Sequence, residues 1–456
     1  MVTVAADDTV VIWKSKCSAC GEERMNYLIY NVLLGLASLF LTPYYAWRVC
    51  VTGKYRKSMG PKFGVNPAEL FSTMKGTPRI WVHAVSVGEV TAAAPIVEAL
   101  RARYPGSCIV LSTSTETGQD AAVRLVPHAT SHFYYPLDIP CIINKVLDGV
   151  APDVFVPVET EIWPNFIRAC QRRAVRVVMV NGRISPRSFK KYRSTRFFWR
   201  EILKKIDAVG VISGTDAERI TAMGMDSARV PVLGNAKYDS LAAGADPVRA
   251  KEMARLLSLS EGTPVFVAGS THGGEDKAVI DAYNSVRHEF PDLILLLVPR
   301  HIERVREIEN LLAAEGLDHE VIRFSEISGG SQRGERRIVL VDAMGVLFSL
   351  YGCAHVVFCG GSLVPRGGQN VLEAAAWGKV VFFGPHMEDF IHERDQLLGS
   401  GAGITVTNAQ GLAAGIKTML KDPEERRRCG EAGKEMVQKN RGAAARYADL
   451  IASVLS

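Results

Sequence analysis

Two glycine-rich motifs that bind phosphate are missing from this 456-residue chain. No GxGxxG follows the first predicted strand of either half, and neither GxxxxGKS nor GxxxxGKT occurs. These absences argue against a dinucleotide-dependent oxidoreductase and against a P-loop nucleotidase, because both classes place those glycines against the phosphates of the nucleotide. The chain also lacks short-period repeats and low-complexity tracts, which argues against a solenoid or a disordered protein.

Disulfide and metal frameworks are missing as well. The nine cysteines are odd in number and scattered, so they fit a reducing compartment and not a disulfide scaffold. Cys17 and Cys20 form a lone CxxC pair without a second pair or a nearby histidine, and no zinc site is expected. The net charge of +6 is compatible with an acidic or phosphorylated partner. It is too modest to indicate nucleic acid, which is not expected as a partner.

One segment near the N-terminus carries no charge. Residues 26–47 approach the ~20 apolar residues that span a bilayer, with aromatic residues near both ends. The basic residues that follow predict a membrane anchor with the rest of the chain in the cytoplasm. A cleaved signal peptide is the competing interpretation, but no small-residue cleavage site follows. Met25 precedes the segment, so residues 1–24 can also be an extended start without a role.

After the anchor, short β-rich runs alternate with helical patterns, which is typical of parallel sheets. The predicted strands are 79–86, 107–114, 154–159, 175–182 and 207–213 in the first half, and 264–270, 293–300, 337–342, 355–362 and 379–385 in the second. Residues 239–250 read as a hinge between them. We expect an α/β protein of two Rossmann-like domains that face each other across a cleft. The expected divisions are an extension and anchor (1–57), a first Rossmann-like domain (58–240), a second Rossmann-like domain (241–430) and a C-terminal helix (431–456).

The stretch "WVHAVSVGEV" (81–90) ends a predicted interior strand in a glutamate, Glu89. Ligands of open α/β sheets bind at the carboxyl ends of strands, where Glu89 is placed. Glu89 also falls in the first turn of a predicted helix, so an N-terminal carboxylate that only complements the helix dipole is the alternative.

A second informative segment runs from 359 to 390. A strand ends at Gly360, Gly361 and Ser362, a glycine pair follows at 367–368, and a helix is expected to start near Asn370. Glycines let backbone amides approach a phosphate, and the helix N-terminus adds a positive dipole end. Glu373, one turn into the helix, could accept hydrogen bonds from ribose hydroxyls. The alternative is a tight turn followed by a helix-dipole carboxylate.

Further loops are predicted to reach the same edges. In the second half, "GSTHGGE" (269–275) carries Ser270 and His272, "VPRH" (298–301) carries Arg300, and "DAMG" (342–345) follows another strand. Arg300 is the natural clamp for a phosphate or carboxylate because its fork binds bidentately.

In the first half, "PVETEIWPN" (157–165) brings Glu159 and Glu161 to a strand end, and Lys237 ends the domain. The basic run that lies between them consists of Arg183, Arg187, Lys190, Lys191 and Arg193, with aromatic residues at 197–199. This run could meet an anionic lipid surface or a phosphorylated acceptor, or be a solvated helix face.

Seven motifs in order resemble the bacterial Kdo (3-deoxy-D-manno-octulosonic acid) transferases of lipopolysaccharide inner-core synthesis. They are "WVHAVSVGE", "VETEIWPN", "NGRISPRS", "GSTHGGE", "LLVPRH", "DAMG" and "GGSLVPRGGQNVLEAAAWGKVVFFGPHMEDF", and the match runs from about Tyr27 to the C-terminus. The resemblance implies a GT-B glycosyltransferase that moves Kdo from CMP-Kdo to a lipid A precursor (lipid IVA), inverting, with no metal and no cofactor.

The resemblance also assigns roles. It implies Glu89 as proton acceptor, with Glu161 and Lys237 stabilising the transition state. The residues that it implies as CMP-Kdo contacts are Pro299, Arg300, Met344, Gly345, Val346, Asn370, Val371, Leu372 and Glu373, while Ser270, His272, Gly361 and Ser362 are possible further members of the site. The chain departs from the family pattern at Val346, Val371 and Gln369, where Glu, Pro and often His stand.

The chemistry fits these roles. A sugar hydroxyl is a poor nucleophile until a base takes its proton, and a carboxylate at a strand end can do that. CMP leaves readily, so charge stabilisation matters more than covalent catalysis, and Lys237 with the glycine-rich helix start could supply it. The rival interpretations are another GT-B enzyme, such as an epimerase or a lipid glycosyltransferase, and a non-catalytic membrane-bound nucleotide sensor.

Overall fold

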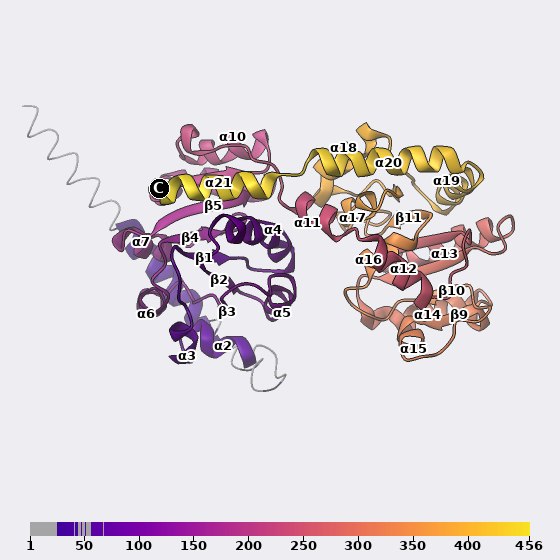
Figure 1. Ribbon diagram of the computed structural model, residues 1–456, viewed down its shortest axis with the longest axis horizontal. Coiled ribbons are helices and arrows are strands. Elements are labelled where there is room, and N and C mark those ends of the chain that lie inside the picture. Colours follow the sequence, from indigo (N-terminus) through magenta and orange to yellow (C-terminus); the bar gives the residue numbers. More distant parts are fainter. Residues whose placement is uncertain (1–24, 41, 44–46, 48–50, 52–55, 67) are drawn as a thin grey trace, which may run out of the picture. The chain divides into compact units, whose positions relative to one another are not determined.

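The computed structural model of the chain describes residues 25–40, 42–43, 47, 51, 56–66 and 68–456 (Figure 1). The chain divides into two compact units. Unit 1 comprises residues 1–240 and 442–456, and unit 2 comprises residues 241–441. The single C-terminal helix expected at 431–456 is instead two helices, because Gly442 takes a left-handed φ of 86° between them. Helix α20 (Pro423–Lys439) belongs to unit 2, and α21 (Ala443–Leu455) returns to unit 1.

Unit 1 is built on a six-stranded parallel sheet of order β3-β2-β1-β4-β5-β6, which is the strand order of a Rossmann fold. Its strands are β1 (Arg79–His83), β2 (Cys108–Thr113), β3 (Ser131–Tyr134), β4 (Val154–Pro157), β5 (Arg176–Gly182) and β6 (Ala208–Val211). Its helices are α2 (Arg56–Lys62), α3 (Ala68–Ser72), α4 (Val87–Arg103), α5 (Glu116–Leu125), α6 (Pro140–Val150), α7 (Pro164–Arg172), α8 (Pro186–Ser194), α9 (Arg196–Leu203), α10 (Gly214–Met223) and α21, with α11 (Lys237–Gly244) crossing the boundary and a 3-10 turn η1 (Ser227–Arg229).

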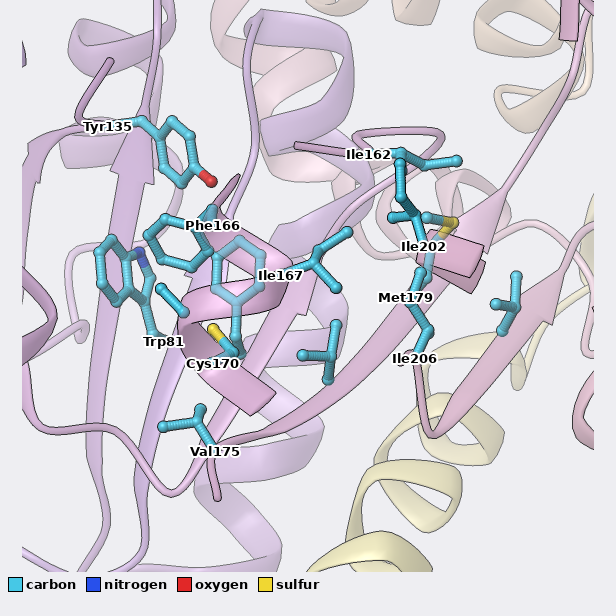
Figure 2. Close-up of a cluster of buried hydrophobic side chains, with 14 of the residues drawn as sticks. Trp81, Tyr135, Ile162, Phe166, Ile167, Cys170, Val175, Met179, Ile202 and Ile206 are labelled. Carbon is cyan, nitrogen blue, oxygen red and sulfur yellow. The ribbon is translucent and has the colours of Figure 1, made fainter. Parts of the chain in front are cut away.

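Alternate residues of the unit 1 strands feed two separate cores, as the period of two in a strand requires. One core holds Trp81 and Met179 against α7, α9 and α10, and Figure 2 shows Trp81 and Phe166 close together in it. Trp81 meets Phe166 edge-on with ring centroids 5.0 Å apart. The other core packs Ile80 and Val82 against α4, α5 and α21. Helices on both faces leave the strand ends as the place for polar chemistry.

Unit 2 is built on a seven-stranded parallel sheet of order β13-β12-β11-β7-β8-β10-β9. Its strands are β7 (Val265–Thr271), β8 (Ile294–Pro299), β9 (Val321–Arg323), β10 (Ile338–Leu340), β11 (Val356–Cys359), β12 (Val380–Phe383) and β13 (Gly403–Thr405). Its helices are α12 (Pro247–Leu256), α13 (Asp276–Arg287), α14 (Val305–Ala314), α15 (Phe324–Ser328), α16 (Leu347–Cys353), α17 (Leu372–Ala376), α18 (Ile391–Ser400), α19 (Ala409–Lys421) and α20, with 3-10 turns η2 (Ile302–Arg304), η3 (Asp318–Glu320) and η4 (Glu388–Phe390).

The predicted anchor is only partly described. Residues 25–40 are helical, whereas 41 and 44–46 lie outside the described residues. Across the part of the chain that the structure describes, no helix has both the length and the apolar character needed to cross a membrane.

Candidate active site

The site of unit 1 lies at the point where the strand order reverses. From β1 the chain goes outward to β2 on one side, and on the other side β4 continues the sheet. Ligands of doubly wound sheets bind outside the strand ends at this switch point. Glu89 follows β1, and Glu159 and Glu161 follow β4, so the fold sets all three carboxylates at this point.

Glu89 sits in the first turn of α4 and folds back over the loop before it. Its carboxylate accepts a hydrogen bond from the Val85 N–H at 2.6 Å and one from the Ser86 hydroxyl at 3.3 Å. The side chain is half-buried. Burial raises the pKa of Glu89 to about 8, and the charges of Glu159 and Glu161 act in the same direction, while its two hydrogen bonds oppose the shift.

Glu161 and Lys237 both belong to this cluster, but they do not pair with each other. Lys237 Nζ donates to Glu159 Oε1 at 2.8 Å, and Trp163 Nε1 donates to Glu161 Oε2 at 2.9 Å. Burial raises the pKa of Glu161 to about 7, the Trp163 hydrogen bond lowers it, and the charge of Glu159 raises it. Of the three carboxylates, Glu159 is thus the one that forms an ion pair with Lys237.

The backbone conformation explains why Lys237 forms its ion pair with Glu159. Glu159 has a left-handed φ of 62°, uncommon for a residue with a side chain, and its N–H bonds to the Val180 carbonyl at 2.9 Å. The neighbouring β5 carries a register shift between Met179 and Gly182. The Asn181 side chain there accepts from the Ala236 N–H at 2.9 Å, which fixes the start of α11 and Lys237 with it.

Unit 2 repeats the arrangement at its own switch point, between β7 and β11. Ser270 lies near the end of β7 with a left-handed φ of 55°, the loop after β7 carries His272, and the loop after β11 carries Gly361 and Ser362. A fully buried carboxylate, Glu275, lies between the two loops.

The glycine loop does not have the form that the sequence suggested. Its amides were expected to face a phosphate, but the N–H groups of Gly361, Ser362 and Leu363 donate to the Glu275 carboxylate at 2.6, 2.9 and 2.9 Å. The Ser362 hydroxyl is also engaged internally, donating to the Cys359 carbonyl at 2.5 Å and accepting from the Gly384 N–H at 2.8 Å. Gly361 and Ser362 therefore shape the loop and have these groups turned inward.

The predicted donor residues Arg300, Asn370 and Glu373 come together at the same edge. Arg300 is exposed directly after β8, and its N–H bonds to the Thr271 carbonyl at 2.9 Å. Asn370 Nδ2 donates to Glu373 Oε1 at 3.2 Å. Burial raises the pKa of Glu373 to about 7, while Asn370 and the charge of Arg300 lower it.

His272 lies beside this group, because its Nε2 is 3.3 Å from Gln369 Nε2 and its ring is 5.8 Å from that of His301. Burial lowers the pKa of His272, with the charges of Arg300 and Arg366 among the weaker causes in the same direction. Histidine and arginine side chains thus approach one edge of the unit 2 sheet.

The remaining predicted donor contacts differ in what they can offer. Met344 is 77% exposed, and Gly345 has a left-handed φ of 81° just before Val346 and α16. Pro299 ends β8 and is buried. The side chains of Val371 and Leu372 are also buried, so these two residues could reach a donor only through their backbones.

The helix at residues 25–40 packs on unit 1 and contacts α9, the helix that follows the basic run. Tyr30 donates to Asp138 Oδ2 at 2.9 Å, and its ring lies 6.0 Å from that of Phe198 in α9. Asn31 and Asn165 exchange amide hydrogen bonds at 3.2 and 2.7 Å. The opposite side of this helix exposes large apolar side chains, namely Leu28, Ile29, Val32, Leu33, Leu36, Leu39 and Phe40.

Two residues of the site received no role from the sequence. Glu159 was noted at the strand end beside Glu161, and Glu275 stands in the quoted motif "GSTHGGE". The only signal for either was a carboxylate close to the end of a buried strand. In the described ranges, no group of three or more His, Cys, Asp and Glu side chains is arranged to hold a metal ion.

Comparison with known proteins places the chain among sugar transferases. A family model described as 3-deoxy-D-manno-octulosonic-acid transferase (kdotransferase) matches residues 57–240. The chain is 32% identical over 401 residues to the 3-deoxy-D-manno-octulosonic acid transferase of Haemophilus influenzae, covering 87% of this chain and 91% of that protein.

Solved structures show the fold. A UDP-GlcNAc 2-epimerase from Neisseria meningitidis bound to UDP-GlcNAc is 12% identical, with a TM-score of 0.57 over 83% of this chain and 99% of that one. A glycosyltransferase from Rickettsia africae is 15% identical, with a TM-score of 0.56 over 82% and 99%. The chain thus has two parallel-sheet α/β domains like those of GT-B glycosyltransferases.

Proposed function

Because the chain belongs to the 3-deoxy-D-manno-octulosonic acid transferase family, and is thus a glycosyltransferase, we propose that it moves Kdo from CMP-Kdo to lipid IVA. Glu89 takes the proton of the acceptor hydroxyl, the oxygen attacks the anomeric carbon of Kdo from the face opposite CMP, and the bond to the CMP phosphate oxygen breaks. The single observation that carries this proposal is the half-buried Glu89 at the switch point of unit 1, with its pKa raised to about 8.

A raised pKa suits this role. A carboxylate of raised pKa is a stronger general base toward a sugar hydroxyl than one of ordinary pKa, because basicity rises with pKa. The neighbouring carboxylates Glu159 and Glu161 favour the protonated product of the transfer step at Glu89. Lys237 pairs with Glu159. In this proposal, Lys237 and Glu161 stabilise the charges that develop in the transition state.

Unit 2 supplies the donor site in this proposal. The guanidinium of Arg300 pairs with the phosphate of CMP. Glu373 accepts hydrogen bonds from the nucleotide, and Asn370 donates to and accepts from its hydroxyl or base atoms. No metal or cofactor is assigned a role, so transfer is expected to continue in EDTA. Restoration of an EDTA-inhibited reaction by Mg²⁺ would contradict this part of the proposal.

The acceptor is proposed to reach unit 1 from a membrane, the cytoplasmic face of the bacterial inner membrane. The support is the exposed apolar side of helix 25–40, whose other side is tied to unit 1 through Tyr30 and Asn31. Phe198 links this helix to α9, and the basic α8 directly precedes α9. An apolar surface beside a basic one is the pattern that binds anionic lipid.

The likeness to an epimerase keeps one alternative in view, because the fold is common to both enzyme classes. One experiment separates them. Purified protein is incubated with freshly generated CMP-Kdo and tetraacylated lipid A precursor, and in parallel with UDP-GlcNAc. The lipid is weighed by mass spectrometry, and the sugar nucleotide is examined by NMR because an epimer has the same mass as its substrate. Addition of Kdo to the lipid supports the proposal, whereas conversion of UDP-GlcNAc without lipid modification would replace it with the epimerase.

A further inference from the structure

Glu275 is a fully buried carboxylate that receives four backbone hydrogen bonds. Oε2 accepts from the N–H groups of His272 at 2.9 Å and Gly361 at 2.6 Å. Oε1 accepts from Ser362 and Leu363, both at 2.9 Å. Four donors fill most of the acceptor positions of one carboxylate.

These donors come from two separate loops, and both loops carry groups of the donor site. His272 belongs to the loop after β7, and Gly361 belongs to the loop after β11, which runs through Asn370 to α17, the helix that carries Glu373. The loops touch closely at Gly361, where a Cβ atom would lie 3.2 Å from the His272 ring. Glu275 is therefore the internal hydrogen-bond acceptor that joins the glycine loop to the loop after β7.

We propose that Glu275 is the positioning residue of the donor site, which holds the loop 360–371 in the conformation that presents Asn370, and Glu373 in the first turn of α17, to CMP-Kdo. This inference rests on the proposed function of unit 2. Glu275 is buried and touches no substrate in this scheme. It acts through the backbone of the glycine loop, by taking up amides that would otherwise turn toward solvent or phosphate.

The adjacent Asp276 shows that a buried carboxylate at this helix start need not act in this way. Asp276 is also buried, but it pairs with the Arg304 guanidinium and not with the glycine loop. Loss of Asp276 should cost stability without changing the loop. The two neighbours form a matched pair for separating positioning from folding.

The test compares the wild-type protein with Glu275→Gln and Asp276→Asn. The glutamine keeps the shape of the side chain but turns an N–H₂ group toward two of the four backbone donors. Binding of CMP is titrated calorimetrically well below the melting temperature of each protein. Amide hydrogen exchange is followed in peptides from 360–372 and, as a reference, from β8.

We expect Glu275→Gln to weaken CMP binding by about tenfold or more, the scale of the loss that follows removal of an outer hydrogen-bond partner at metal sites. Exchange in 360–372 should accelerate while β8 stays protected, and Asp276→Asn should change neither. Should Glu275→Gln fail to fold, Glu275→Asp replaces it, because its shorter side chain keeps the charge but cannot span both loops. Wild-type CMP affinity in the folded variant would overturn the inference alone, whereas a wild-type protein that does not bind CMP would overturn the proposed donor and this inference with it.

Discussion

The two units use carboxylates in opposite ways at equivalent points of the same fold. In unit 1, Glu89 accepts two hydrogen bonds and Glu161 accepts one from Trp163. Burial raises the pKa of both carboxyl groups. In unit 2, Glu275 receives four N–H groups and organises a loop. A buried carboxylate with few donors remains available as a base, whereas one surrounded by donors becomes part of the framework.

The largest expected effect is the loss of the general base in unit 1, with the donor site of unit 2 unchanged. Glu89→Gln should lower transfer by about 10² or more, because that is the smallest usual contribution of general-base catalysis. CMP affinity should not change. The measurement is initial rate on lipid acceptor together with CMP titration. Glu98→Gln is the control, since this exposed glutamate lies on the same helix α4. Near wild-type turnover of Glu89→Gln would remove Glu89 from the base role.

The next effect breaks unit 2 and leaves the base intact. Arg300→Ala should weaken CMP binding by about 1.5–3 kcal/mol, the value of a charge-assisted hydrogen bond. The control is Arg306→Ala, an exposed arginine on the neighbouring α14. If calorimetry gives the same CMP affinity for wild type and Arg300→Ala, the donor phosphate binds elsewhere.

The third expected effect concerns the basic surface of α8 in unit 1 and its attraction to anionic lipid. Lys190→Gln/Lys191→Gln in α8 should slow transfer on anionic liposomes on the order of tenfold at low salt, because each cation near the surface contributes about 1 kcal/mol. The loss should shrink at high salt through screening. The matched pair in unit 2 is Arg427→Gln/Arg428→Gln, where both arginines are exposed but bonded to Glu431 and Glu425. Equal rates for the two variants on liposomes would reduce α8 to a solvated helix face.

The smallest effect is a shift of a pH profile. Glu89 must be deprotonated to act, so kcat/KM of the wild type should rise as the pH passes through about 8. The charge of Glu161 raises the pKa of Glu89. Its removal in Glu161→Gln should therefore move the rising limb to lower pH, whatever happens to the plateau. A limb that stays in place or moves to higher pH would show that the two carboxylates are not coupled.

The central strands were predictable because they are continuous apolar runs. "RIWVH" and "ILLLVP" are enclosed on both faces, and the sequence shows this directly. The sequence did not predict β3, β9 and β13, which read "SHFY", "VIR" and "GIT". Each is three or four residues long at the edge of its sheet, where one neighbour suffices and no apolar run is required.

The site was predictable only as far as residue types at strand ends. Glu89, Glu161 and Lys237 were assigned to one place, but the partner of Lys237 is Glu159, since a left-handed backbone at that residue redirects its side chain. The inward turn of the Gly361 and Ser362 amides depends on Glu275, 86 and 87 residues away in the chain. No local pattern carries information of that range.

The return of the last helix to unit 1 bears on how the protein can be dissected genetically. Tyr447 and Ile451 of α21 are fully buried, and the Tyr447 hydroxyl donates to the Gly234 carbonyl at 2.8 Å. A fragment that stops at residue 240 would lack this helix and expose the face of the core that it covers. Unit 2 is one continuous stretch, 241–441, and can be excised with a single start and stop. Unit 1 can be produced separately only if a short linker joins residue 240 to residue 442 and replaces the whole of unit 2.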